Sequence, residues 1–239
     1  MVVVAIIAVL LAILAPAVGR GFAAARSFRC QTSLRSVAFD FTVFADEALH
    51  PRRGNDENRT PGRFGLDTFI ESQYGIDEFW SAGTAATVVR EAGKGGDDPM
   101  RCAEVRGTIT LNRALPCTLG AITPASNISY GFNLRLSRPE SKEGNRIRSV
   151  LLSEKILLAG RVPLVFDVDA PAAAKSGTGT PPTFGAPPLG VVGPYATGKF
   201  WYPGLRHAGA MNVGFVDGSV DSSSEALKEA GWKWDYRPH

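Results

Sequence analysis

The feature that most constrains this chain is its N-terminal run of 19 residues, MVVVAIIAVLLAILAPAVG, which contains no charged side chain. As an α-helix this run would be roughly 28 Å long, close to the thickness of the hydrocarbon core of a bilayer. A helix of a soluble protein usually keeps a polar face, and this run has none. The run therefore predicts a transmembrane helix over residues 1–19.

The same helix is expected to continue outside the membrane over residues 20–50. Apolar residues recur there at intervals of three and four and form one stripe: Leu34, Val37, Ala38, Phe41, Phe44, Ala45 and Ala48. Pro51 should end the helix, and Pro16, which lies inside it, should kink it because proline removes a backbone hydrogen bond. The pattern predicts a long helix whose second half packs on a separate domain.

A cleaved signal peptide is the alternative for the first segment. No basic residue precedes the apolar run, and the small residues around Pro16 would place a proline inside the cleavage tripeptide. Both features argue against a signal peptide.

The orientation of the chain in the membrane is a separate difficulty. Arg20, Arg26, Arg29 and Arg35 follow the run, and by the positive-inside rule these charges would keep the rest of the chain in the cytoplasm.

Residues 51–239 are expected to form a β-rich domain. Alternating or β-rich segments predict strands at 107–111, 128–136, 149–152, 162–168, 212–216 and 219–221. Residues 64–80 are expected to form a short helix or an irregular cover of the core, and residues 82–92 a helix. Residues 169–198 contain six prolines and six glycines, so we expect a long flexible loop there.

The last two strands flank Asp217-Gly218, a pair that predicts a two-residue type I′ turn with positive φ at the glycine. Val213 and Phe215 should then share the core face of their strand. The aromatic tail from Trp232 to Tyr236 should pack back on the sheet or on a neighbouring subunit.

The chain has three cysteines, Cys30, Cys102 and Cys117, and no CxxC pair, so the sequence predicts no zinc site. In an oxidising compartment Cys102 and Cys117 can form a disulfide across the short segment between them. The alternative is two separate buried thiols. Cys30 is left without a predicted partner.

Composition and motifs argue against several functions. A net charge of +3 from scattered basic residues does not favour a nucleic-acid partner. The sequence has no nucleophile elbow, metalloprotease helix or phosphate-binding loop, so we predict no enzymatic activity, no cofactor and no metal. His207 with Asp217 as an acid–base pair is disfavoured for the same reason, and a structural role for His207 in the loop before the hairpin is preferred. A calcium site at Asp217, Asp221 or the Asp167/Asp169 pair is the minor alternative, since no loop spacing supports it.

Two segments at opposite ends of the chain carry a resemblance to a known family. The first is the run VVVAIIAVLLAILAPAVGRGFAAARSFRCQTSLRSVAFDF, and the second is His207 followed by nine residues and then Asp217-Gly218. Together they resemble type IV pilins and pseudopilins, in particular the bacterial subgroup with a prepilin-type N-terminal methylation motif and a C-terminal H-X9-DG motif. Residues 100–102, 129–133 and 165–167 resemble internal landmarks of that subgroup more loosely.

The resemblance implies an α+β, pilin-like fold, in which a long N-terminal helix, transmembrane in its first half, packs on an antiparallel β-sheet domain. It implies a non-enzymatic structural subunit of a type IV pilus or a type II secretion-like assembly. The subunit would lie in the inner membrane as a single-pass protein with its C-terminal domain outside the cytoplasm. Its partners would be the membrane and other pilin-like subunits, through helix packing.

The sequence departs from the family at its start. The family has a basic leader, a cleavage site after glycine and an early glutamate before the aliphatic run, and this sequence begins at Met1 inside that run. We expect the reading frame to extend upstream of Met1; the alternative is a member that has lost the processing signal. A leader there would be a substrate for prepilin peptidase, and its positive charge would resolve the orientation difficulty.

The alternative function is a membrane-tethered extracytoplasmic binding module, with residues 169–198 and the aromatic tail contacting a ligand.

Overall fold

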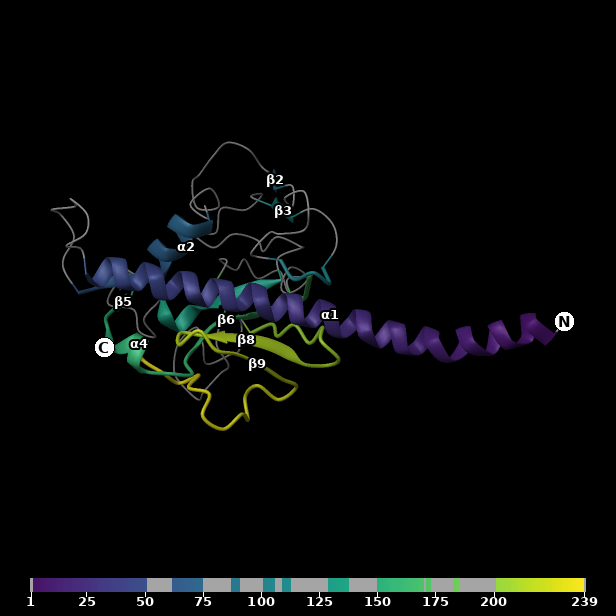
Figure 1. Ribbon diagram of the computed structural model, residues 1–239. Helices are drawn as coiled ribbons and strands as arrows, with labels where there is room; N and C mark the ends of the chain where they lie inside the picture. The colour runs from purple at the N-terminus through teal and green to yellow at the C-terminus, as the bar shows by residue number, and fades with distance from the viewer. Residues whose placement is uncertain are drawn as a thin grey trace.

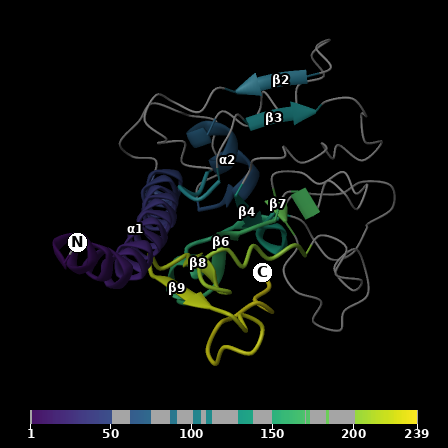
Figure 2. The same ribbon diagram turned by 90° about the vertical axis from the view of Figure 1, so that its right-hand side faces the viewer.

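A computed structural model describes residues 2–50, 62–74, 87–90, 101–105, 109–112, 129–137, 150–169, 171–172, 183–184 and 201–238. One long helix lies along a β-sheet, and its N-terminal half extends away from the rest of the molecule (Figures 1 and 2). The sheets are antiparallel apart from one short parallel pair. This arrangement agrees with the predicted α+β class and its long N-terminal helix.

The long helix, α1 (Val2–Leu49), is continuous over 48 residues. It passes through Pro16 without interruption, and Figure 1 shows its axis bending within the first, purple half. Its most apolar 18-residue window has a mean hydropathy of 2.9, and no residue of that window is buried. By length and composition, the first half of α1 could therefore cross a membrane.

The second half of α1 packs on the sheet through the predicted stripe. All seven residues of that stripe are buried, which confirms the prediction. Cys30 extends the same stripe by one turn toward the N-terminus and is also fully buried. Leu34, Phe41 and their neighbours belong to the same hydrophobic core as the sheet residues, so this part of the helix and the sheet share one core.

The main sheet has five strands in the order β7 (Thr183–Phe184), β4 (Tyr130–Asn133), β6 (Pro163–Asp167), β8 (Met211–Phe215) and β9 (Val220–Ser223). Only the β4–β7 pair is parallel. Two further pairs are formed by β1 (Phe64–Gly65) with β5 (Leu151–Leu152), and by β2 (Thr87–Arg90) with β3 (Ile109–Asn112). The described residues also form the helices α2 (Leu66–Tyr74), η2 (Leu134–Leu136, a 3₁₀ turn) and α4 (Lys155–Leu158).

Both faces of the central strands are covered, which is why β6 and β8 are buried at every position. On the helix side, Gly214 of β8 lies against Leu34 of α1. On the other side, Phe215 stacks edge-on against Trp232 of the C-terminal tail, with ring centroids 5.0 Å apart. Because side chains alternate along a strand, Val213 shares the face of Phe215 and points away from α1. The tail therefore packs back on the sheet, as one of the two predicted alternatives proposed.

One prediction of local structure was wrong, and a second is modified at one short pair of residues. Residues 82–92 were expected to be helical, but Thr87–Arg90 forms β2 and pairs with β3. Its Thr-Val-Val sequence is rich in β-branched residues, which favour a strand once a partner strand is present. Within the expected loop 169–198, Thr183–Phe184 pairs with β4. Phe64 to Tyr74 contains β1 and α2, which fits the expected short helix.

The turn between β8 and β9 also differs from the prediction. The Phe215 N–H donates to the Ser219 carbonyl and the Gly218 N–H to the Phe215 carbonyl, so the loop has three residues. Gly218 has φ = 81°, as expected, but Asp217 does not have positive φ. This is a type I turn followed by a left-handed glycine, the usual form of a three-residue hairpin loop, and not a two-residue type I′ turn.

Gly214 provides a test of how closely α1 lies on β8. A methyl group added at Gly214 would lie 3.0 Å from Val165 Cγ1 and 3.2 Å from the Leu34 carbonyl oxygen. Because that oxygen belongs to the helix backbone, it cannot move without moving α1. We expect Gly214→Ala to lower the free energy of unfolding by about 1–3 kcal/mol, measured on the full chain in detergent by denaturant titration.

Gly21→Ala is the matched control, because Gly21 lies in α1 with no atom within 4 Å of the added methyl. It should leave the stability unchanged or raise it slightly, since alanine favours a helix over glycine. If Gly214→Ala unfolded at the same denaturant concentration as the parent, α1 would not lie on β8 at this distance.

Candidate functional site

The described residues bring five polar or sulfur-containing side chains together beneath α1. Cys30 comes from α1, Cys102 from the segment 101–105, Asp167 from the end of β6, and Arg206 with His207 from the segment before β8. We call these five residues the buried polar cluster. The two cysteines and Asp167 are fully buried, the His207 side chain is 3% exposed and the Arg206 side chain is 20% exposed.

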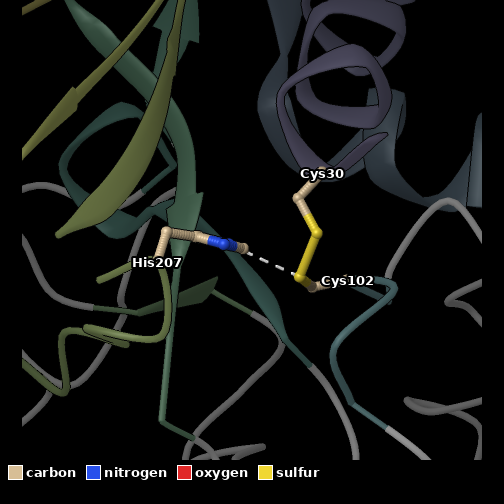
Figure 3. A group of neighbouring side chains, drawn as sticks. All are labelled: Cys30, Cys102 and His207. Atoms are coloured by element: carbon tan, nitrogen blue, oxygen red, sulfur yellow. Dashed lines mark hydrogen bonds between the residues drawn. A yellow bond between two sulfur atoms is a disulfide. The ribbon is translucent and has the colours of Figure 1, made fainter. Parts of the chain in front are cut away.

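Cys30 and Cys102 form a disulfide, with their Cα atoms 5.1 Å apart (Figure 3). This corrects the predicted Cys102–Cys117 bond, because one sulfur can form only one disulfide. Cys117 itself lies outside the described residues. Cys102 pairs with Cys30 because of the way α1 packs. Cys30 precedes Leu34 by four residues on the same buried stripe, so its sulfur lies against the sheet. The bond joins segments 72 residues apart in sequence.

The His207 ring points at this disulfide (Figure 3). Its Nε2 lies 3.5 Å from Cys102 Sγ and 3.4 Å from Asp167 Oδ2. Its Nδ1 faces the Glu104 carboxylate at 3.7 Å, which is beyond hydrogen-bonding distance. Among the described residues, Nδ1 is buried and has no hydrogen-bond partner.

Asp167 and Arg206 form a buried ion pair. Arg206 Nη2 donates to Asp167 Oδ1 at 3.0 Å, and the Asn212 N–H donates to Asp167 Oδ2 at 2.8 Å. The guanidinium also donates to the carbonyl oxygens of Val168 and Ser129, at 2.7 and 2.8 Å. Each charge is thus compensated by its partner and by backbone groups, the condition under which a buried ion pair is tolerated.

Tyr130 connects the cluster to the helix. Its hydroxyl donates to the Cys30 carbonyl oxygen at 3.2 Å. Burial, and next the negative charge of Asp167, raise the pKa of Tyr130 well above its usual value, so the hydroxyl stays protonated. The Cys102 N–H donates to Ser129 Oγ at 2.7 Å. The cluster therefore ties α1, the segment 101–105, β4 and β6 into one unit.

The two ends of the H-X9-DG motif do not meet. His207 precedes β8 and Asp217 follows it, so they are separated by the length of a five-residue strand, roughly 13 Å between its end residues. His207 forms a tight turn with Ala210, in which Ala208 and Gly209 both have positive φ, at 54° and 84°. The nine intervening residues are thus this turn, strand β8 and the start of the next loop. The histidine and the Asp-Gly pair of the motif therefore lie at opposite ends of one strand. An acid–base pair of His207 and Asp217 is not formed.

Asp217 instead organises the hairpin loop. It accepts hydrogen bonds from the Arg161 N–H at 2.8 Å and the Ser219 N–H at 3.0 Å, and from the Ser219 hydroxyl. Partial burial by itself would raise the pKa of Asp217, but these hydrogen bonds outweigh it and hold the pKa below its usual value. Asp221 pairs with the Arg161 guanidinium at 2.6 Å. Because Asp221 already pairs with a cation and Asp217 accepts hydrogen bonds within the loop, the calcium site considered there is disfavoured.

The Asp167/Asp169 alternative for calcium is disfavoured as well. Asp167 is paired with Arg206, and Asp169 Oδ1 accepts a hydrogen bond from the Ala172 N–H at 3.0 Å. Asp167 is the last residue of β6 and Asp169 follows the strand, and the two carboxylates bind different partners.

The sequence singled out His207, Cys102 and Asp167, the last as half of a disfavoured calcium pair, but did not bring them together. Cys30 could have been recognised as part of the core, because it continues the apolar stripe of α1. Arg206 carried no signal of its own, since a charged residue near a strand end is usually exposed. The arrangement provides sulfur and imidazole ligands and a buried ion pair, and within the described residues no serine, threonine or free thiol lies against His207 as a nucleophile would.

No protein-family model matches the chain, and no match was found among curated proteins or among solved structures.

The buried ion pair yields the first test of the cluster. Asp167→Asn would leave the Arg206 guanidinium without its carboxylate, and we expect a loss of about 3–5 kcal/mol in the free energy of unfolding. Asp169→Asn is the matched control, because Asp169 is partly exposed and the same change there should cost less than about 1 kcal/mol. Denaturant titrations of the full chain in detergent compare the two. Equal losses of the free energy of unfolding in the two variants would show that the ion pair with Arg206 does not stabilise the fold.

Asp217 provides a pH-dependent test. Because its pKa is lowered in the folded state, its hydrogen bonds stabilise the fold above the unfolded pKa of about 3.8, and this contribution disappears as the pH falls through the folded pKa. We expect the stability difference between the parent and Asp217→Asn to be present at pH 6 and to shrink between about pH 4 and pH 2.

The control for that experiment is Asp235→Asn, which removes an exposed carboxylate and corrects for the general effect of charge. Thermal melts over the pH series provide the data. A parent–Asp217→Asn difference that stayed constant down to pH 2 would contradict the role of the carboxylate in the loop.

Proposed function

We propose that the chain is a non-enzymatic, pilin- or pseudopilin-like structural subunit of a type IV pilus or type II secretion-like assembly at the cell envelope. The observation that carries this proposal is that three large apolar side chains of α1 lie exposed on the side of the helix that the sheet does not cover. The H-X9-DG motif and the aliphatic N-terminal run support it as points of resemblance.

The uncovered face lies in the half of α1 that packs on the sheet. Phe28, Phe39 and Val43 are 68%, 64% and 41% exposed. At 100° per residue these three positions fall within roughly 60° of one another, and Leu34 and Phe41 fall on the opposite side of the helix. The helix therefore presents a stripe of large apolar side chains to its surroundings, beyond the part that a membrane would cover.

Large apolar side chains gathered on one exposed face usually mark a contact surface. Helices packed side by side in an assembly would bury such a stripe against the α1 of neighbouring copies. The exposed residues of the first half, from Val2 to Val18, continue the same surface into the membrane. A simple membrane anchor would need the first half alone, so the Phe28–Phe39–Val43 stripe favours the assembling subunit over the tethered binding module.

The disulfide supports an extracytoplasmic location for the sheet domain. Structural disulfides form and persist in oxidising compartments and are rare in the cytosol. The Cys30–Cys102 bond lies in the part of the chain that follows the membrane segment. We therefore propose a single-pass inner-membrane protein whose C-terminal domain lies outside the cytoplasm. This orientation is opposite to the one that the arginines after the apolar run would favour by the positive-inside rule.

The test changes the exposed face without touching the core. Phe39→Lys places a charge on the free stripe and should leave the melting temperature of the chain unchanged while reducing chain-to-chain cross-links in membranes at least about fivefold. The measurement is chemical cross-linking in cells that express the chain, followed by detection of dimers and higher species.

Leu158→Lys is the matched control. Leu158 is 79% exposed on α4, outside α1, and the same change there should leave cross-linking unaffected. If both variants cross-linked like the parent, the proposed helix-to-helix assembly would be wrong, and the tethered binding module would be favoured.

A further inference from the structure

We infer that Cys30, Cys102 and His207 form a zinc-binding site when their disulfide is reduced. This goes beyond the proposed structural role and does not depend on it. The sequence predicted no metal, because its cysteines have no zinc-binding spacing; only the fold brings these three residues together.

The ligand atoms are already gathered. Two sulfurs and one imidazole nitrogen lie within 4.8 Å of one another, and all three residues are buried. In a tetrahedral zinc site with Zn–S near 2.3 Å and Zn–N near 2.0 Å, neighbouring ligand atoms are about 3.3–3.8 Å apart. His207 Nε2 and Cys102 Sγ are 3.5 Å apart, so this edge of the tetrahedron is in place. The two sulfurs, held together by their bond, would have to separate, and Cys30 Sγ already lies within 4.8 Å of the imidazole nitrogen.

The unused nitrogen of His207 fits the same arrangement. A histidine that binds zinc through one nitrogen usually donates its other N–H to a carboxylate or carbonyl, which fixes the orientation of the ring. His207 Nδ1 has no hydrogen-bond partner among the described residues, and the Glu104 carboxylate lies 3.7 Å from it. A shift of less than about 1 Å would complete this bond.

Asp167 lies next to the site without belonging to the group of three ligand residues. Its Oδ2 lies 3.4 Å from His207 Nε2. The charges also balance: two thiolates neutralise the zinc ion, and Arg206 already neutralises Asp167 through a 3.0 Å ion pair. A filled site would therefore add no net charge to the buried polar cluster.

The chemistry requires a reductant, which we specify as a trialkylphosphine or a cellular dithiol. Two electrons pass from it to the disulfide, and each sulfur takes one proton to become a thiol. Zinc then displaces both protons and binds two thiolates. Zinc would thus replace the disulfide as the link between α1 and the segment 101–105, so that the helix stays joined to this segment in either redox state.

The experiment uses the full chain in detergent, with and without reduction by a trialkylphosphine that is then removed. Zn²⁺ is titrated in competition with a chromophoric chelator. We expect one Zn²⁺ per reduced chain, bound at least about 100-fold more tightly than by the oxidised chain. Zinc should also raise the melting temperature of the reduced chain and leave that of the oxidised chain unchanged. Equal affinity in the two redox states would overturn the proposal.

Variants then identify the ligands. Cys30→Ser and Cys102→Ser should abolish tight binding, and Glu104→Gln should weaken it about 10–100-fold. Cys117→Ser is the matched control, because Cys117 is not one of the proposed ligands, and this variant should bind zinc like the reduced parent. Loss of binding in Cys117→Ser would overturn the assignment.

A spectroscopic measurement on the unmutated chain guards against variants that fail to fold. Co²⁺ added to the reduced parent should give the intense visible absorption of a tetrahedral site, together with thiolate-to-metal charge-transfer bands in the near ultraviolet. The weak spectrum of octahedral cobalt, or the same spectrum before and after reduction, would show that the two thiolates do not bind the ion.

Discussion

The structure depends on the close packing of the second half of α1 against strand β8. The helix backbone at Leu34 lies against Gly214, a position where the strand has no side chain, and this contact sets the distance between helix and sheet. At that distance the apolar stripe of α1 fills the space above β6 and β8. The N-terminal helix is therefore both an apolar rod that extends from the molecule and an integral part of its core.

The same packing creates the buried polar cluster. A helix that lies so close to the sheet brings Cys30 to Cys102 and presses the Tyr130 hydroxyl against the Cys30 carbonyl. Beneath them the Asp167–Arg206 pair and His207 occupy the space that apolar residues fill elsewhere. The charges of Asp167 and Arg206 are stable there because each has the other as its partner, so this pair favours one arrangement of the segments that carry it.

The H-X9-DG motif acquires a physical meaning from this geometry. Its histidine contributes to the buried polar cluster at one end of β8, and its Asp217-Gly218 pair shapes the hairpin loop at the other end. The spacing between them is the length of the strand with its turns. Both ends of the motif thus position β8, the strand on which α1 packs. The exposed Phe28–Phe39–Val43 stripe lies on the other side of α1 and remains available for the helix packing that we propose.

The sequence by itself determined the long helix, its buried stripe and most of the strands, because these follow from local periodicity. It did not determine β2, where pairing with β3 outweighed a weak helical pattern. It could not determine the Cys30–Cys102 bond or the pairing of Asp167 with Arg206. Those partners lie 72 and 39 residues apart, and no periodicity connects them. Only the tertiary structure decided these contacts: the packing of α1 on the sheet brings the two sulfurs together, and the pairing of β6 with β8 brings Asp167 beside Arg206. Side chains this distant in sequence come into contact only when strands pair and the helix closes on the same core.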